Sequence, residues 1–485
     1  MRIAFSTQLQ FDTCSIPAVE LNLECRDEII PILRSLQHIY STPRLRDELL
    51  RLVGQDVNSD SRDDCGREGL SYWQILVLQS VRLGCNLNYD RLQDVAENHR
   101  KLRGIMGVGE WDETSFDFRR IRDNVCRLAP ETIAAISDLI VAEGHRLKPA
   151  AARTTRADSF VMDTNIHYPT ESSLIRDGVR KLIELCVPLA EEHGLDGWRQ
   201  HEHIGRQVRR AARRIERIAA KKGTSYRERL QAAYRRLFKH SRKVVRRARA
   251  VCEALGLPAA TAADVFGPHT LQAFIARTEH VQQTAKRRVL QGESVPNNEK
   301  LFSLFEPHTQ LYKRGKAGEP IQFGRLALVF EDGAGFLTHY HILPRDQGDQ
   351  DVAVEQLKIV QDKLGGRIER ASFDRGFHTP ENQTALQKIV QHVCVPKPGK
   401  CQSLAQEATA DEEFFAARQS HPGVESAIGG LQSGNGLQRC RDRSERGYER
   451  YLALGVLGRN LHTLGKILIA EQSPDCAAAH SRRAA

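Results

Sequence analysis

The segment from Gln322 to Pro344, QFGRLALVFEDGAGFLTHYHILP, decides the fold class. It contains two apolar runs, Phe323–Phe330 and Phe336–Leu343, separated by the sequence EDGAG, whose composition is typical of turns. Two strands joined by such a turn form a β-hairpin. The segment therefore predicts an antiparallel pair of strands.

Other short apolar runs surround this hairpin in the sequence. One lies in ADSFVMDTNI and ends at Asp163, and two more cover Ile368–Phe373 and His392–Val395. Helical patterns at Val352–Leu364 and Pro380–Val390 separate the later strands. Strands that alternate with helices in this order predict an α/β fold, with a mixed five-stranded sheet and helices on its faces.

The first 152 residues predict an all-helical region. One strongly apolar helix begins near Ser71, a second contains Leu92, and a third opens at the polar residues Asp112–Thr114. Short helices joined by Gly and Asn turns are typical of a helix-turn-helix binding module. They are equally typical of a small helical bundle, so both interpretations stay open.

The composition limits the class of protein. The 485 residues carry 71 Lys and Arg against 61 Asp and Glu, and 40% of them are hydrophobic, which excludes an intrinsically disordered chain. No apolar run approaches the roughly 18 residues of a membrane span, and the N-terminus shows no export signal. Eleven dispersed cysteines without a CxxC pair indicate reduced thiols and argue against structural zinc. We therefore expect a cytoplasmic protein without a membrane partner.

The positive charge is concentrated in one segment. Residues 199–250 contain 19 Lys and Arg but only 3 Asp and Glu, whereas the rest of the chain carries a net negative charge. Apolar residues at helical spacing, interrupted at Gly223, predict two basic helices. A solvated helical face usually mixes both signs of charge, so the surplus indicates a polyanionic partner, and a phosphate backbone is the natural one. The candidate contacts are Arg209, Arg210, Arg213, Arg214, Arg235, Arg236, Lys243, Arg246 and Arg247.

Two aspartates follow apolar runs in the same way. Asp163 ends SFVMD and Asp374 ends ASFD, and side chains just past the ends of parallel strands gather at one edge of a sheet. Neighbouring carboxylates repel unless a cation neutralises them, and Mg²⁺ or Mn²⁺ prefers oxygen ligands. Two such ions suit phosphodiester transfer. Each aspartate taken singly is more often a cap or a turn residue.

A third carboxylate would come from a C-terminal helix. Glu425 is the best candidate because Pro422 can start a helix there, with Val424 and Ile428 as its apolar face. Three rivals lie in a preceding polar stretch, namely Glu407, Glu412 and Glu413.

Four motifs resemble bacterial insertion-sequence transposases of the ISNCY type, within the DDE superfamily. They are TNIHYPTESSLIRDGVRKL (164–182), FEPHTQLYKRGKAGEPIQFG (305–324), SFDRGFHTPENQ (372–383) and HPGVESAIGGLQSGNGLQRCRDRSERGYERYLALGVLGRNLHTLG (421–465). The resemblance extends from about Leu70 to Lys466. It implies a ribonuclease H-like catalytic domain and an N-terminal DNA-binding region.

The resemblance also implies an activity. A transposase of this kind cleaves strands at transposon ends and then joins the freed 3′-hydroxyl to target DNA. The catalytic Asp, Asp and Glu of the family fall on Asp163, Asp374 and Glu425, which would bind two Mg²⁺ or Mn²⁺ ions. The implied partner is double-stranded DNA, both terminal repeats and target, and pairing two ends implies a homodimer or higher oligomer associated with the bacterial nucleoid.

The resemblance adds candidate DNA contacts and shows two departures. Lys313 and Lys316 lie in a basic loop before the hairpin. Leu431 and Gln432 occupy the zone where related transposases carry a basic residue after the glutamate, so that role passes to Arg439 or Arg441, or is absent. The basic insertion also lies between the first strand and the hairpin, whereas many relatives place one before the glutamate helix.

These expectations together predict a domain organisation. Residues 1–152 form the helical DNA-binding domain, residues 153–171 and 297–470 form the catalytic domain, residues 172–296 form the basic helical insertion, and residues 471–485 form a disordered tail. Two alternatives remain for the function. One is a DNA-binding relic of a transposase without catalysis, and the other is a metal-dependent nuclease of the same fold.

Overall fold

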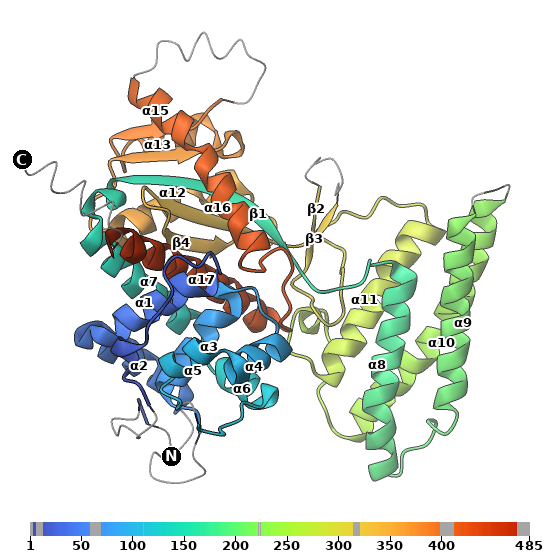
Figure 1. Cartoon of the computed structure of the whole chain (residues 1–485). Helices are drawn as coiled ribbons and strands as arrows, with labels where there is room; N and C mark the ends of the chain where they lie inside the picture. Colours follow the sequence, from blue (N-terminus) through green and yellow to red (C-terminus); the bar gives the residue numbers. More distant parts are fainter. Residues whose placement is uncertain are drawn as a thin grey trace, which may run out of the picture. The chain divides into compact units, whose positions relative to one another are not determined.

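A computed structural model describes residues 3–5, 13–58, 69–109, 111–221, 223, 225–313, 321–397 and 412–472. The protein is mixed α/β (Figure 1). It divides into two compact units, of which unit 1 comprises Met1–Asp163 and Leu326–Ala485, and unit 2 comprises Thr164–Arg325. None of the described helices combines the length and the apolar character needed to cross a bilayer.

The sheet of unit 1 contains the five predicted strands. They are β1 (Thr154–Asp163), β3 (Gln322–Asp332, which begins in unit 2), β4 (Leu337–Ile342), β5 (Arg370–Phe373) and β6 (His392–Cys394). Their order is β4-β3-β1-β5-β6. The pair β3–β4 is antiparallel, as predicted for the hairpin, whereas β5 is parallel to both β1 and β6. A short strand that the sequence analysis missed, β2 (Gln310–Tyr312), pairs with the start of β3 within unit 2.

Helices cover both faces of this sheet. On one face, α16 (Pro422–Ser433) packs against β1, and Phe160 and Met162 of β1 belong to the same hydrophobic core as Val424 of α16. On the other face, Gln356 of α12 (Asp349–Lys363) is hydrogen-bonded to His339 of β4 at 2.9 Å. Side chains of a strand alternate between the two faces. The even-numbered residues of β1, such as Phe160 and Met162, therefore point toward α16.

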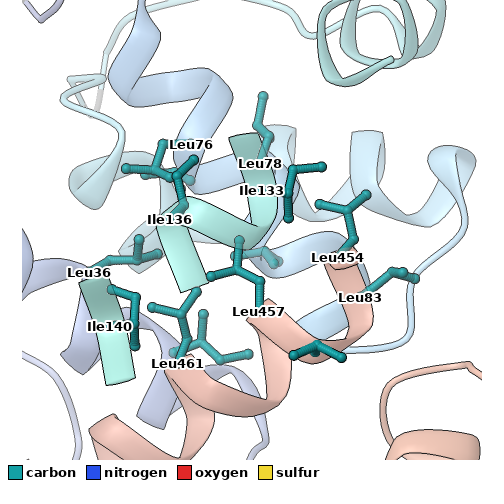
Figure 2. Close-up of a cluster of buried hydrophobic side chains, with 14 of the residues drawn as sticks. Leu36, Leu76, Leu78, Leu83, Ile133, Ile136, Ile140, Leu454, Leu457 and Leu461 are labelled. Atoms are coloured by element: carbon teal, nitrogen blue, oxygen red, sulfur yellow. The ribbon is translucent and has the colours of Figure 1, made fainter. Parts of the chain in front are cut away.

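The main core of unit 1 is helical. The long helix α17 (Glu445–Gln472) is apolar on most of its circumference, as expected for a helix with neighbours on several sides. It packs against α1 (Ile29–Ser41), α3 (Tyr72–Gly84) and α7 (Pro130–Leu147). Figure 2 shows leucine and isoleucine side chains from all four helices meeting in this core, among them Leu36, Leu76, Ile136 and Leu457.

Smaller helices complete unit 1. They are α2 (Pro43–Val57), α4 (Tyr89–Asn98), α5 (Arg100–Ile105), α6 (Phe118–Val125), α13 (Pro380–Leu386) and α15 (Glu412–Ser420). The predicted helix start near Ser71 is confirmed, because the Ser71 side chain caps α3 in a reciprocal pair of hydrogen bonds with Gln74. The predicted start of α6 at Asp112–Thr114 is wrong. The Asp117 side chain accepts the first free N–H groups of this helix, so it begins at Phe118.

Unit 2 is built around four helices, α8 (Glu171–Glu192), α9 (His201–Ala220), α10 (Tyr226–Ala254) and α11 (Leu271–Leu290). Their apolar faces enclose a second core with residues such as Leu182, Val208, Leu237 and Phe274. The two basic helices predicted from the sequence are α9 and α10. The predicted boundary between a DNA-binding domain and a catalytic domain at residue 152 stays a prediction. Both segments belong to unit 1, which is defined by packing and not by function.

Candidate active site

Asp374 directly follows β5, as predicted. Its backbone remains extended, with φ −75° and ψ 168°, before the short 3₁₀ helix Arg375–Phe377 begins. The side chain is exposed to solvent. A carboxylate at the carboxyl end of a central parallel strand occupies the sheet edge where α/β proteins commonly bind ligands.

The register between β1 and β5 identifies the neighbour of Asp374. Arg156 is paired with Ser372, and Ala157 is paired with Phe373. The next position on β1 is Asp158, and the next position on β5 is Asp374, which is still extended. Residues paired across neighbouring strands point to the same face of a sheet, so continuing this register sets Asp158 opposite Asp374 on one face.

Asp163 is placed differently from what the sequence analysis predicted. The strands of Asp163 and Asp374 are neighbours, but Asp163 lies five residues beyond Asp158, about 16 Å further along the strand. Five is an odd number, so a regular strand turns the Asp163 side chain to the face opposite Asp158. Its backbone is held by the segment after α16, since its N–H donates to the carbonyl of Gln438 at 3.0 Å. The expectation that Asp163 and Asp374 lie side by side is therefore wrong.

Glu425 lies on the face of the sheet that carries Asp158. It is an exposed residue in the first turn of α16, which begins at Pro422 as predicted and buries Val424 and Ile428. A side chain at position 423 would overlap the guanidinium of Arg156, so the start of α16 lies directly over the residue two positions before Asp158. The even-numbered residues of β1, Asp158 among them, thus lie on the face covered by the helix that carries Glu425.

His421 links the helix start to the carboxylates. Its Nδ1 lies 3.1 Å from the Ser372 hydroxyl of β5. Burial lowers the pKa of the imidazole, and the negative charges of Asp374 and Glu425 partly oppose this effect. The charges of both predicted carboxylates, Asp374 and Glu425, therefore act on one imidazole.

A partly buried ion pair lies beside these residues. Nε of Arg156 is 2.5 Å from a carboxylate oxygen of Glu331 on β3, and its Nη1 donates to the carbonyl of Ser420 at 2.9 Å. Burial raises the pKa of Glu331, whereas the Arg156 charge lowers it. Arg156 thus joins three parts of the site, namely β1, β3 and the end of α15.

The rival carboxylates are less well placed. Glu413 on α15 forms an ion pair with Arg370 at 2.9 Å, and Glu412 is exposed in the first turn of the same helix. Glu407 lies outside the described residues. Among the described residues, no three carboxylate, imidazole or thiol groups are close enough together to form a metal site. The donor set of Asp158, Asp374 and Glu425 nevertheless consists of oxygen ligands, which fit Mg²⁺.

Asp158 was not predicted as a site residue, because it lies inside its strand and not at the strand's end. A charged residue inside a strand is costly to bury and can therefore be a signal of function. Asp158 comes directly before the run SFVM, whereas Asp374 comes directly after the run ASF. Only the pairing of the two strands shows that these residues occupy matching positions.

The predicted DNA contacts fall in three places. Four on α9 (Arg209, Arg210, Arg213, Arg214) and four on α10 (Arg235, Arg236, Lys243, Arg246) are exposed, and Arg247 is half-buried. Lys313 is exposed just after β2, and Lys316 lies outside the described residues. Arg439 is exposed in the segment that pairs with the end of β1 at Asp163.

Comparison with protein-family models, with curated proteins and with solved structures found no match to this chain.

Proposed function

We propose that this protein is a DDE-type DNA transposase whose catalytic carboxylates are Asp158, Asp374 and Glu425. The observation that carries the proposal is the β1–β5 register, which aligns Asp158 with Asp374 on the face covered by α16. The motif resemblance supplies the activity, namely metal-dependent strand cleavage at transposon ends followed by strand transfer from a 3′-hydroxyl.

The proposal includes a ribonuclease H-like sheet. It is supported by the position of β1, which has an antiparallel hairpin on one side and two parallel strands on the other. Central strands are the most rigid part of such a sheet, and catalytic groups on rigid elements keep their geometry. Asp158 and Asp374 are both carried by central strands, and Glu425 approaches them from a helix packed on that sheet.

The three carboxylates would hold Mg²⁺ or Mn²⁺, which when bound supplies charge neutralisation for phosphodiester cleavage. The surrounding side chains keep these ligands in place. The hydrogen bond between His421 and Ser372 fixes the start of α16 to β5, four residues before Glu425. Arg156 neutralises Glu331, so this buried carboxylate does not add its charge to the ligand set.

The experiment compares four single variants on a labelled duplex that carries the terminal repeats of the encoding element. Asp158→Asn, Asp374→Asn and Glu425→Gln should each lower metal-dependent nicking at the repeat boundary by at least about 100-fold, since each removes a ligand charge. Asp163→Asn is the matched control and should retain nicking within about threefold of the wild type. A pre-cleaved end tests strand transfer separately.

Each outcome has a clear meaning. Loss of nicking in Asp163→Asn together with normal nicking in Asp158→Asn would contradict the assignment made from the register. Cutting without strand transfer would favour a nuclease of the same fold. Binding of the duplex without cutting, with either metal and in every protein, would favour a DNA-binding relic.

A further inference from the structure

The outer faces of α9 and α10 carry a dense set of exposed cations. We call this set the α9–α10 face, and it consists of Arg209, Arg210, Arg213, Arg214, Arg217, Arg235, Arg236, Lys239, Arg242, Lys243 and Arg246. The buried residues of both helices, such as Val208, Ala211, Leu237 and Val244, point into the bundle core. At 3.6 residues per turn the cations therefore project from the opposite side. Because α9 and α10 pack against each other, their outer sides form one surface of unit 2.

Within the part of the chain that the structure describes, no carboxylate lies within 4.0 Å of these eleven cations. Several cations elsewhere in unit 2 form ion pairs with carboxylates. Arg180 of α8 lies 3.7 Å from Glu184, Arg249 near the end of α10 lies 2.6 Å from Glu279, and Arg287 of α11 forms ion pairs with Glu293 and Glu299. The structure thus distinguishes the cations of the α9–α10 face, which have no carboxylate within 4.0 Å among the described residues, from ion-paired cations such as Arg180, Arg249 and Arg287.

The unpaired charges act on their surroundings. Burial lowers the pKa of His240, and the neighbouring Arg236, Lys239 and Lys243 lower it further. Like charges three or four residues apart, as at Arg209 and Arg213, also destabilise a helix by a few tenths of a kcal/mol per pair. This cost is offset when a polyanion binds, and release of its counterions makes that binding favourable.

We propose that the α9–α10 face binds duplex DNA through its phosphates without reading its base sequence. α9 has 20 residues and is about 30 Å long, close to one turn of the double helix. Two helices side by side are about 20 Å wide, whereas the major groove is about 12 Å wide and admits one helix. The face must therefore lie across the phosphate backbones. This suits target or flanking DNA, and the choice of DNA as the polyanion rests on the proposed function.

An anionic membrane surface is a weaker fit. The large hydrophobic side chains that stand exposed in the described residues, such as Trp111 and Phe266, lie outside α9 and α10. An interfacial helix needs such side chains to enter the lipid. Charge without exposed apolar anchors favours a nucleic acid.

The test measures binding of the full-length chain to two 30-base-pair duplexes of unrelated sequence, by fluorescence anisotropy in EDTA over a salt series. The face variant carries Arg213→Gln, Arg236→Gln and Lys243→Gln. The matched control carries Arg180→Gln, Arg249→Gln and Arg287→Gln, which remove the same charge from the ion-paired cations. The face variant should bind at least tenfold more weakly, with a log–log salt slope reduced by about 2–3, whereas the control should change less than about threefold.

Other outcomes overturn the proposal. Equal weakening in both variants would show that total charge matters and the face does not. A tenfold preference for one duplex would show that bases are read, and equal competition by vesicles of anionic phospholipid would favour a membrane. Thermal unfolding followed by circular dichroism verifies that each variant is folded. If the triple variant is unfolded, the three single substitutions replace it, and each should lower the log–log salt slope by about 0.9.

The test also separates this inference from the proposed function. In EDTA no metal is available to the carboxylate site and the DNA is not cut, so the anisotropy reports binding alone. Face-dependent binding by a protein that never cuts DNA would leave the inference intact while the proposed catalysis fails.

Discussion

At the scale of single residues, His339 on β4 shows how burial controls protonation. Its Nε2 lies 2.9 Å from the side-chain oxygen of Gln356. Burial lowers the pKa of the imidazole to about 4, since a charged ring would lose its hydration, and the nearby charge of Lys363 acts in the same direction. At neutral pH the ring is therefore neutral in the folded protein.

This depressed pKa predicts acid sensitivity. Below about pH 6.5 the unfolded chain binds a proton at this histidine that the folded chain does not bind until about pH 4. The free energy of unfolding therefore falls as the pH decreases through this window, by about 2 kcal/mol between pH 7 and pH 5. His339→Gln should lose less stability than the wild type over that range, as measured by urea denaturation at both pH values. Identical losses in the two proteins would contradict the prediction.

At the scale of elements, the contact between α17 and α3 depends on glycine. A Cβ at Gly458 would lie 2.6 Å from the backbone nitrogen of Gly84 and 2.7 Å from its Cα. Backbone atoms of a packed helix cannot move away as the end of a flexible side chain can. The absence of side chains at this crossing lets the central helix of unit 1 approach α3 closely.

Gly458→Ala should therefore destabilise unit 1 by about 1–3 kcal/mol through overpacking, although alanine favours a helix. Urea unfolding measures this loss: the midpoint should fall, while the dependence of the unfolding free energy on urea concentration should stay the same. Gly429→Ala on α16 is the control, because a Cβ there meets no atom within 4 Å, and its stability should stay the same or rise by up to about 1 kcal/mol. A Gly458→Ala protein as stable as the control would show that the two backbones can separate without cost.

At the scale of the whole molecule, the two units have hydrophobic cores with no residue in common. The core of unit 1 contains Trp73, which is 1% exposed, and the core of unit 2 contains Trp198, which is 5% exposed. Cooperative unfolding follows shared packing, so separate cores favour separate transitions.

The tryptophans allow each transition to be followed. Trp111→Phe with Trp198→Phe leaves Trp73 as the reporter of unit 1, and Trp111→Phe with Trp73→Phe leaves Trp198 as the reporter of unit 2. Fluorescence of the two variants in urea should give different midpoints, and circular dichroism of the wild type should span both. One coincident transition for all three signals would contradict two independently unfolding units.

Much of the fold could be predicted because local patterns encode it. The hairpin at Gln322–Pro344, the strands before Asp374 and at His392, and the start of α16 at Pro422 all follow from apolar periodicity and turn chemistry. The strand β2 was missed because three residues carry too little periodicity. The onset of α6 was missed because two aspartates, Asp112 and Asp117, could each serve as a cap, and only the structure shows that Asp117 does.

The sequence by itself determined the mixed α/β class, the two basic helices and the three segments that carry candidate carboxylates. Only the tertiary structure decided which of these carboxylates stand at matching positions of neighbouring strands. Strand alternation has a period of two, and the pairing of Ala157 with Phe373 brings Asp158 beside Asp374 and leaves Asp163 further along the strand. Likewise, only folded contacts between helices distinguish the ion-paired arginines of unit 2 from those on the α9–α10 face. Strand register and ion pairs depend on contacts between residues far apart in the chain, so they cannot be predicted from local sequence patterns.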